Sequence, residues 1–216
     1  ARTAEINNFP LPGELESPVG ATAKTNAVCY VGGISRIRGI VEVIKAMGLL
    51  ETKARLKLAG GFAPKSLRDE VAGLQGWEAV DELGFVDRAG VRDVLAISVA
   101  GLVTFLPAPN HIDAQPNKMF EYMSAGLPVI ASDFPLWREI IAGNDCGLLV
   151  DPENPRTIAE AIDRLVQDPA MAQRMGENGI RAVKKKYNWG IEEKKLLALY
   201  DELVGAPRRM AQAAAA

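Results

Sequence analysis

Two residues that could do chemistry, Lys118 and Glu121, stand three positions apart in the stretch 107–132. Pro116 suits the first turn of a helix there, and Gly126 ends it. A helix N-terminus favours an anion, so a lysine in the first turn suggests that an anionic ligand or a carboxylate pairs with it. Glu121, one turn further, could accept hydrogen bonds from a pair of hydroxyls, as a carboxylate facing a ribose does. The stretch therefore favours a ligand with both an anionic and a hydroxyl-bearing group.

A plainer interpretation of this helix places Lys118 on a solvated face, paired with Tyr122 or Glu121. The apolar residues of the same helix are expected in the core rather than against a ligand: Met119, Phe120 and Met123. The single histidine, His111, is expected to be a solvated loop residue.

A second candidate for anion binding is the turn that contains Gly32, Gly33 and Arg38. Glycines let the backbone approach a ligand, and the helix that follows offers free N–H groups to an anion. Arg38 could add a positive charge against a phosphate. The fingerprint G-x-G-x-x-G is absent, which disfavours nicotinamide cofactors. The alternative is a turn needed only for packing, with Arg36 and Arg38 solvated.

Strands and helices that would position these residues alternate through residue 150. The expected strands are short apolar runs at 26–32, 54–59, 77–85, 101–106, 127–131 and 146–150. The expected helices lie at 38–50, 64–74, 87–97 with Asp87 as N-cap, 116–125, 135–142, 154–167, 169–187 and 191–204. Alternation of this kind, with near-continuous apolar strands, is typical of a parallel sheet covered on both faces. The predicted fold is a Rossmann-like three-layer α/β/α domain with about six parallel strands.

Composition excludes several classes of protein. The 216 residues are 48% hydrophobic, with 25 basic and 27 acidic side chains, which argues against disorder and against nucleic acid as a partner. Cys29 and Cys146 are expected as buried thiols, because their spacing suits no zinc site. No apolar run approaches the length of a membrane-spanning helix and no signal peptide is visible, so a cytoplasmic location is expected. The Pro- and Asn-rich start without methionine resembles an interdomain linker, and the sequence is expected to be a piece of a longer protein.

Residues 26–204 resemble the C-terminal, donor-binding domain of GT-B glycosyltransferases, in particular the large retaining group known as glycosyl transferases group 1 or family four. The matching pieces are 30–40, 116–132, 138–141 and 146–152, with a helical ending that contains Tyr187-Asn-Trp189 and Tyr200. The piece 116–132 (Pro-Asn-Lys-Met-Phe-Glu-Tyr-Met-Ser-Ala-Gly-Leu-Pro-Val-Ile-Ala-Ser) is the most specific of these.

The resemblance implies roles for particular positions. The family has a Glu-x7-Glu motif, whose second glutamate would be Glu121 and would bind the nucleotide ribose. The first falls on Asp113, which is one carbon shorter and would face the donor sugar and its reacting carbon. The family usually has Gly-Arg-x4-Lys at the first turn; Gly33 stands at the arginine position and Arg38 at the lysine position. The diphosphate would therefore depend on Arg38, Lys118 or backbone N–H groups of the central helix.

The implied site is metal-independent, uses a nucleotide-diphosphate sugar as substrate and needs no cofactor. Gly84, Phe85 and Val86 would border the nucleobase, and Glu139 matches an acidic position after the fifth strand. The expected catalytic residues are Asp113, Arg38 and Lys118. The expected donor-binding residues are Gly32, Gly33, Arg38, Gly84, Phe85, Val86, Asp113, Pro116, Asn117, Lys118, Met119 and Glu121.

The implied function is retaining hexosyl transfer, with this chain as the donor half of a two-domain enzyme. Residues 1–20 would be a linker, 21–187 the nucleotide-sugar-binding domain, 188–206 a crossover helix and 207–216 a flexible tail. A missing N-terminal domain would supply the acceptor, a glycan or lipid-linked sugar, with a peripheral position at the inner face of the membrane as one possible location. The isolated chain would lack turnover. Two alternatives are a non-hydrolysing nucleotide-sugar epimerase and a non-catalytic α/β interaction module.

Overall fold

A computed structural model describes residues 3–15 and 24–204 of the chain, and its centre is a parallel sheet of six strands. The strands are β1 (Ala27–Val31), β2 (Arg55–Ala59), β3 (Val80–Gly84), β4 (Ala100–Val103), β5 (Val129–Ser132) and β6 (Gly147–Val150). Their order across the sheet is β3-β2-β1-β4-β5-β6. Strands β2 and β3 thus extend the sheet on one side of β1, and β4, β5 and β6 extend it on the other side. Ligands of open α/β sheets bind beyond the carboxyl ends of the strands where the strand order reverses in this way.

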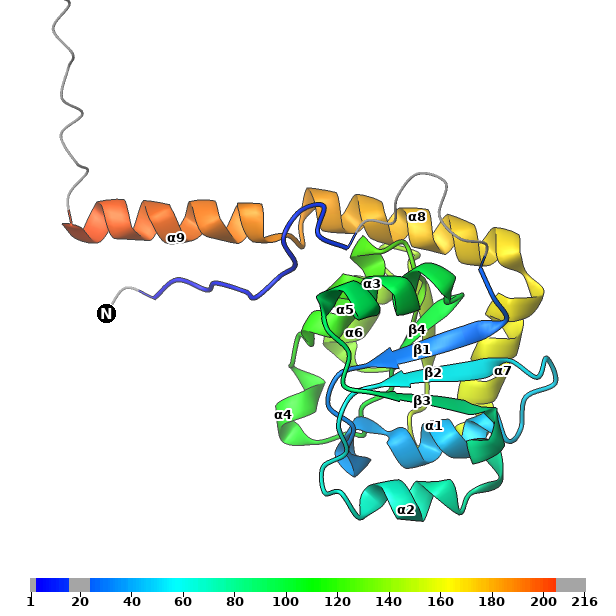
Figure 1. Cartoon of the computed structure of the whole chain (residues 1–216). Helices are drawn as coiled ribbons and strands as arrows, with labels where there is room; N and C mark the ends of the chain where they lie inside the picture. Colours follow the sequence, from blue (N-terminus) through cyan, green and yellow to red (C-terminus); the bar gives the residue numbers. More distant parts are fainter. Residues whose placement is uncertain (1–2, 16–23, 205–216) are drawn as a thin grey trace, which may run out of the picture.

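Helices cover both faces of the sheet (Figure 1). They are α1 (Ile40–Met47), α2 (Leu67–Ala72), α3 (Arg88–Ile97), α4 (Pro109–Ile112), α5 (Asn117–Ser124), α6 (Pro135–Ile141), α7 (Pro155–Gln167), α8 (Pro169–Lys185) and α9 (Trp189–Val204), with short 3-10 helices η1 (Arg36–Arg38) and η2 (Gln75–Ala79). One core lies under α1, α2 and α7, and the other under α3, α5 and α6, with α8 contributing to both. The predicted three-layer Rossmann-like fold is confirmed.

Most of the predicted elements are present, with shifted ends. The helix expected at 38–50 begins only at Ile40, because Gly39 takes a left-handed conformation (φ 78°) that separates η1 from α1. The strand expected at 77–85 begins at Val80, since Trp77 lies in η2. Asp87 caps α3 as predicted: its side chain accepts a hydrogen bond from the backbone N–H of Gly90. The short helix α4 was not predicted.

The described part of the N-terminal segment, residues 3–15, packs on the domain. Phe9 lies 4.7 Å from Phe120 and 5.6 Å from Tyr187, measured between ring centroids. The carbonyl of Pro10 accepts a hydrogen bond from the backbone N–H of Trp189, the first residue of α9. The segment and α9 leave the domain on the same side (Figure 1). The predicted linker 1–20 is described only over 3–15, and the predicted tail 207–216 lies outside the described residues.

Both cysteines are free and buried, as predicted. In the part of the chain that the structure describes, no helix is long and apolar enough to cross a membrane. The cytoplasmic location stays a prediction.

Candidate anion-binding site at the strand switch point

The turn after β1 and the N-terminus of α5 meet beside the gap between β1 and β4, where the strand order reverses. Gly32 has φ 113°, which only glycine adopts readily. The hydroxyl of Tyr30 donates to the carbonyl of Gly33 (3.0 Å) and so fixes the turn. The hydroxyl of Tyr122 accepts a hydrogen bond from the backbone N–H of Val31 (2.9 Å), which ties α5 to the end of β1.

Lys118 is the most unusual residue of this site. Its side chain is 8% exposed and extends beneath the turn, so that a Cβ added to Gly32 would lie 3.6 Å from Lys118 Cε. Lys118 Nζ stands 3.6 Å from the centroid of the Tyr30 ring and 5.6 Å from that of Phe105. Among the described residues it has no hydrogen-bond partner. The interpretation that placed Lys118 on a solvated face with Tyr122 or Glu121 is therefore wrong.

The electrostatics of Lys118 follow from this burial. Loss of hydration, and then the charge of the nearby Arg38, lower the pKa of Lys118 to about 7. The two aromatic rings offer only a partial substitute for water around the ammonium. A buried cation is costly unless it is paired, so the site is suited to an anion that would supply the missing partner.

Arg38 occupies the space above Gly33. Its Nη1 donates a hydrogen bond to the Gly33 carbonyl (3.1 Å), and a Cβ at position 33 would lie only 2.6 Å from that nitrogen. The Arg38 guanidinium carbon also lies 5.6 Å from the centroid of the Phe105 ring, which Lys118 Nζ approaches at the same distance. Arg38 and Lys118 thus place two cations around one aromatic ring at the end of the sheet.

Glu121 lies next to this pair of cations and makes an ion pair with Arg88. Glu121 Oε1 accepts from Arg88 Nη1 at 2.7 Å, and Arg88 Nε donates to Glu14 Oε1 at 2.7 Å. A pocket of about 220 Å³ is lined by these three residues and by Asn8, Phe9, Pro10, Leu11 and Asn117. Gly84, the last residue of β3, and Val86 are half-buried, whereas the Phe85 side chain is 90% exposed.

The loop before α5 carries Asp113 and His111. Asp113 is exposed at the C-terminal end of α4, where its backbone N–H donates to the His111 carbonyl. Its side chain makes no hydrogen bond or ion pair within the described residues. The prediction of a solvated His111 is wrong: its side chain is 6% exposed, and its Nδ1 lies 3.0 Å from the Leu106 carbonyl oxygen. The indole N–H of Trp137 donates to the Ala114 carbonyl (2.7 Å). These contacts hold the loop, so Asp113 projects from an anchored segment.

The matched helix contributes through its backbone as well as its side chains. Pro116 is the N-cap of α5 and Asn117 is exposed at its first turn. Met119 is fully buried with Phe120 and Met123, as expected for core residues, so any contact of Met119 with a ligand would come from its backbone. Gly32, Arg38 and Lys118, from the first turn and α5, therefore lie together at one end of the sheet.

Comparison with known proteins decides the family. The family model described as glycosyl transferases group 1 matches residues 14–182 of the sequence.

The chain belongs to this family.

Individual relatives agree with the assignment to glycosyl transferases group 1. An alpha-D-kanosaminyltransferase of Streptomyces kanamyceticus is 26% identical over 180 residues, which are 82% of this chain and 45% of that protein. The structure of sucrose-phosphate synthase from Thermosynechococcus elongatus is 26% identical with a TM-score of 0.76, covering 90% of this chain and 51% of the other. HepE of Anabaena, solved in complex with UDP-glucose, has the same fold (TM-score 0.71, 18% identity, covering 82% of this chain and 49% of the other). The chain spans about half the length of the relatives it matches.

Residues that were not predicted for the site support the predicted ones in this group 1 member. Tyr30 is the platform under Lys118, and Arg88 with Glu14 holds Glu121. A large aromatic residue in a buried strand before a glycine turn is the only sequence signal for Tyr30. Nothing in the sequence pairs positions 14, 88 and 121, because they meet only through the fold.

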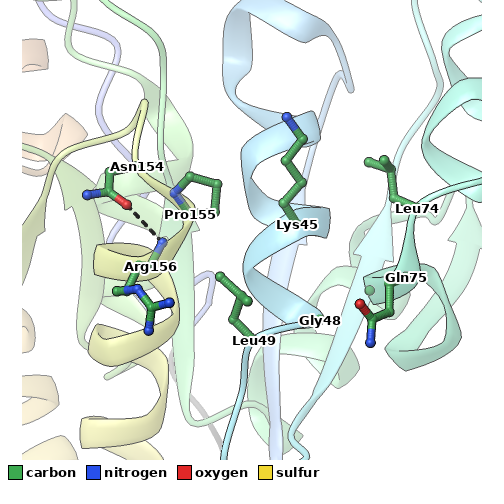
Figure 2. A pocket seen from close by; sticks show the side chains of 9 residues that line it. Lys45, Gly48, Leu49, Leu74, Gln75, Asn154, Pro155 and Arg156 are labelled. Carbon is green, nitrogen blue, oxygen red and sulfur yellow. Dashed lines mark hydrogen bonds between the residues drawn. The ribbon is translucent and has the colours of Figure 1, made fainter.

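Two further pockets in the described part of this family member are lined by none of the predicted donor-binding residues. Figure 2 shows one of about 430 Å³ between the C-terminal end of α1, with Lys45 and Leu49, and the start of α7, where Asn154 caps the helix. A larger, mainly apolar pocket of about 780 Å³ lies along α7 and α8. Among the described residues, no group of three or more His, Cys, Asp and Glu side chains is placed to hold a metal ion.

Proposed function

We propose that this chain binds the nucleotide-sugar donor of a retaining, metal-independent glycosyltransferase. The observation that carries the proposal is the buried Lys118 ammonium, which lacks a partner within the described residues and lies beside the Arg38 guanidinium. The family membership supports sugar transfer as the activity. The name of the kanosaminyl-transferring relative also supports sugar transfer, and the UDP-glucose complex of the Anabaena protein supports a nucleotide sugar as the donor. The retaining outcome rests on the family resemblance.

In the proposed complex the diphosphate lies between the Gly32–Gly33 turn and the N-terminus of α5. Lys118 and Arg38 then each gain an anionic partner, and the unpaired backbone N–H groups of the first turn of α5 add their dipoles. Negative charge builds on the leaving phosphate as the bond to the sugar breaks. Fixed cations stabilise that charge without reorganising, which lowers the barrier to transfer. The two cations and the turn would thus act most strongly in the transition state.

The remaining groups of the donor are assigned to the neighbouring residues. Glu121 accepts hydrogen bonds from the ribose hydroxyls, and Gly84, Phe85 and Val86 border the base. Asp113, exposed on its anchored loop, faces the sugar and its reacting carbon. Its side chain is one carbon shorter than the glutamate usual at this position, so the sugar must lie closer to the loop for the carboxylate to reach it.

The partner of this domain is proposed to be another domain of the same protein, which would bind the acceptor. The relatives are about twice as long as the matched region, which supports a second domain. The N-terminal segment and α9 leave on the same side and would both run toward it (Figure 1). Leu197, Tyr200 and Leu203 on α9 are exposed apolar residues of the kind that such a contact would cover.

Calorimetric titration of the chain with UDP, GDP and ADP, each free and sugar-linked, tests the donor site. At least one nucleoside diphosphate is expected to bind, and Glu121→Ala is expected to weaken that binding by about tenfold, the value of a lost charge-assisted hydrogen bond. Inorganic diphosphate serves as the control ligand, because it contacts only the cations and its affinity should not fall in the variant.

Two results of this titration would count against the proposal. Binding of none of these ligands by the unmodified chain would contradict it directly. Unchanged nucleotide affinity in Glu121→Ala would favour a non-catalytic interaction module with this loop as its docking surface. Epimerised rather than transferred sugar from the longer protein would favour the epimerase.

A further inference from the structure

Three segments far apart in the sequence meet around one guanidinium. Arg88 Nε donates to Glu14 Oε1 and Arg88 Nη1 to Glu121 Oε1, both at 2.7 Å. The hydrogen bond that Arg88 donates to Glu14, and then the one that it donates to Glu121, raise the pKa of Arg88. The first of these bonds also lowers the pKa of Glu14. Two carboxylates therefore share one guanidinium, and each accepts one hydrogen bond from it.

The position of Arg88 at the start of α3 constrains how its side chain reaches the two carboxylates. Arg88 is the first residue of α3, directly after the N-cap Asp87. A cation at a helix N-terminus is unfavourable to the helix dipole, so Arg88 gains from carboxylates placed around it. The helix start fixes its backbone, and Glu14 holds the side chain by a second nitrogen. Arg88 thus reaches Glu121 from a constrained geometry.

The free part of the Glu121 carboxylate faces the small pocket described above. Arg88 engages Oε1, and within the described part of the chain Oε2 makes no hydrogen bond. An ionised carboxylate can accept about four hydrogen bonds, so one held by a single donor keeps room for two hydroxyls. Asn117 at the start of α5 and the segment from Asn8 to Leu11 complete the walls.

We infer that Arg88 is a positioning residue for ribose recognition and that Glu14, from the N-terminal segment, holds Arg88 in place. This inference rests on the proposed role of Glu121. Arg88 fixes the rotamer of Glu121 and turns Oε2 toward the ligand. The segment before the Rossmann-like sheet is then part of the donor site rather than only a connection between domains.

The side chains of Arg88, Glu14 and Glu121 are too exposed for their ion pairs to serve mainly to stabilise the fold. The side chains of Arg88, Glu14 and Glu121 are 43%, 32% and 19% exposed. Ion pairs this open to water add little to stability, because solvent screens them and the side chains lose freedom on pairing. Variants of Arg88 and Glu14 should therefore fold, which allows their effect on a ligand to be measured.

The test compares the nucleoside diphosphate that binds best with its 2′-deoxyribose analogue, by calorimetry. The unmodified chain should prefer the ribose form by about tenfold, the value of one hydrogen bond to a charged group. Arg88→Met should reduce that preference to about twofold or less, and Glu14→Gln should give an intermediate value. Affinity for inorganic diphosphate should not change. Arg68→Met is the matched control, because it removes a similarly exposed arginine that pairs with Glu82 and not with Glu14 or Glu121.

The possible results separate this inference from the proposed function. An undiminished ribose preference in both Arg88→Met and Glu14→Gln would overturn the inference and leave the donor site intact. No nucleotide binding by the unmodified chain, or binding without ribose preference, would overturn the role of Glu121 and this inference with it. If Arg88→Met fails to show a cooperative thermal transition, the ribose preference of Glu14→Gln alone decides whether the inference stands.

Discussion

Lys118→Met is expected to weaken nucleoside diphosphate binding by at least about 100-fold and, at the same time, to stabilise the folded chain. Lys118 is nearly fully buried between Tyr30 and Phe105, with no hydrogen-bond partner in the described residues. Methionine has a similar length and no charge, so it fills the same space without the desolvation penalty. The gain in unfolding free energy is on the order of 3 kcal/mol near neutral pH. A stabilising substitution that abolishes binding is typical of a strained functional site.

The stabilisation should depend on pH in a fixed direction. In the folded chain the pKa of Lys118 is about 7, below its ordinary value of 10.5. Between these values the unfolded chain binds the extra proton, so the stability of the unmodified chain rises with pH across this window. The advantage of Lys118→Met is therefore largest at and below about pH 7 and shrinks as the pH rises toward 10.5.

Urea unfolding at about pH 6.5 and about pH 9.5 measures this difference, with calorimetry for the ligand. Lys45→Met is the matched control, because Lys45 is an exposed lysine on α1. That control should change neither the stability nor the affinity appreciably. A Lys118→Met chain that is less stable than the unmodified one at the lower pH would show that the ammonium is satisfied in the fold.

Gly39→Ala is expected to destabilise the chain by about 3 kcal/mol or more. Gly39 has φ 78°, and an added Cβ would lie 1.9 Å from the backbone oxygen of Thr104. That oxygen belongs to the chain just after β4, which also donates a hydrogen bond from the Leu106 N–H to the Ile37 carbonyl. Neither backbone can move away without separating the Arg38 turn from the loop that carries Phe105.

Gly84→Ala separates the two causes of the stability lost in Gly39→Ala, which are the left-handed backbone conformation and the clash of the added Cβ with Thr104. Gly84 has φ 65° but nothing within 4 Å of an added Cβ, so it reports the conformational cost alone, about 1 kcal/mol. Unfolding free energies from urea titration should differ between the two variants by about 2 kcal/mol. Equal losses would mean that the contact between Gly39 and Thr104 contributes nothing beyond the backbone conformation.

The sequence was sufficient for the order and type of the main elements. Apolar runs bounded by glycine identify β1 and β2, and Asp87 and Pro135 mark helix starts that the structure contains. The helix α4 was missed because a single turn between Pro109 and Asp113 carries no periodicity. The end of the strand before it also gave no sign that His111 would fold back onto the Leu106 carbonyl.

The site was predictable only where one motif contains the residues. Lys118 and Glu121 lie on one helix, so their spacing indicated a shared role. The environment of Lys118 was not predictable, because Tyr30 lies on β1 and Phe105 lies just after β4, and only the sheet order brings these two segments together. The position of Arg38 above Gly33 was not predictable either. The sequence shows that position 33 has no side chain, but it does not show that the Arg38 guanidinium occupies that space.

A crystal structure of the chain with its best-binding nucleoside diphosphate tests the central claim most directly. The account predicts the diphosphate within hydrogen-bond distance of Lys118 Nζ and next to the Gly32–Gly33 turn, with the ribose hydroxyls on the Glu121 carboxylate. A nucleotide seated elsewhere, for example in the apolar pocket along α7 and α8, with Lys118 Nζ still lacking an anionic partner, would contradict it.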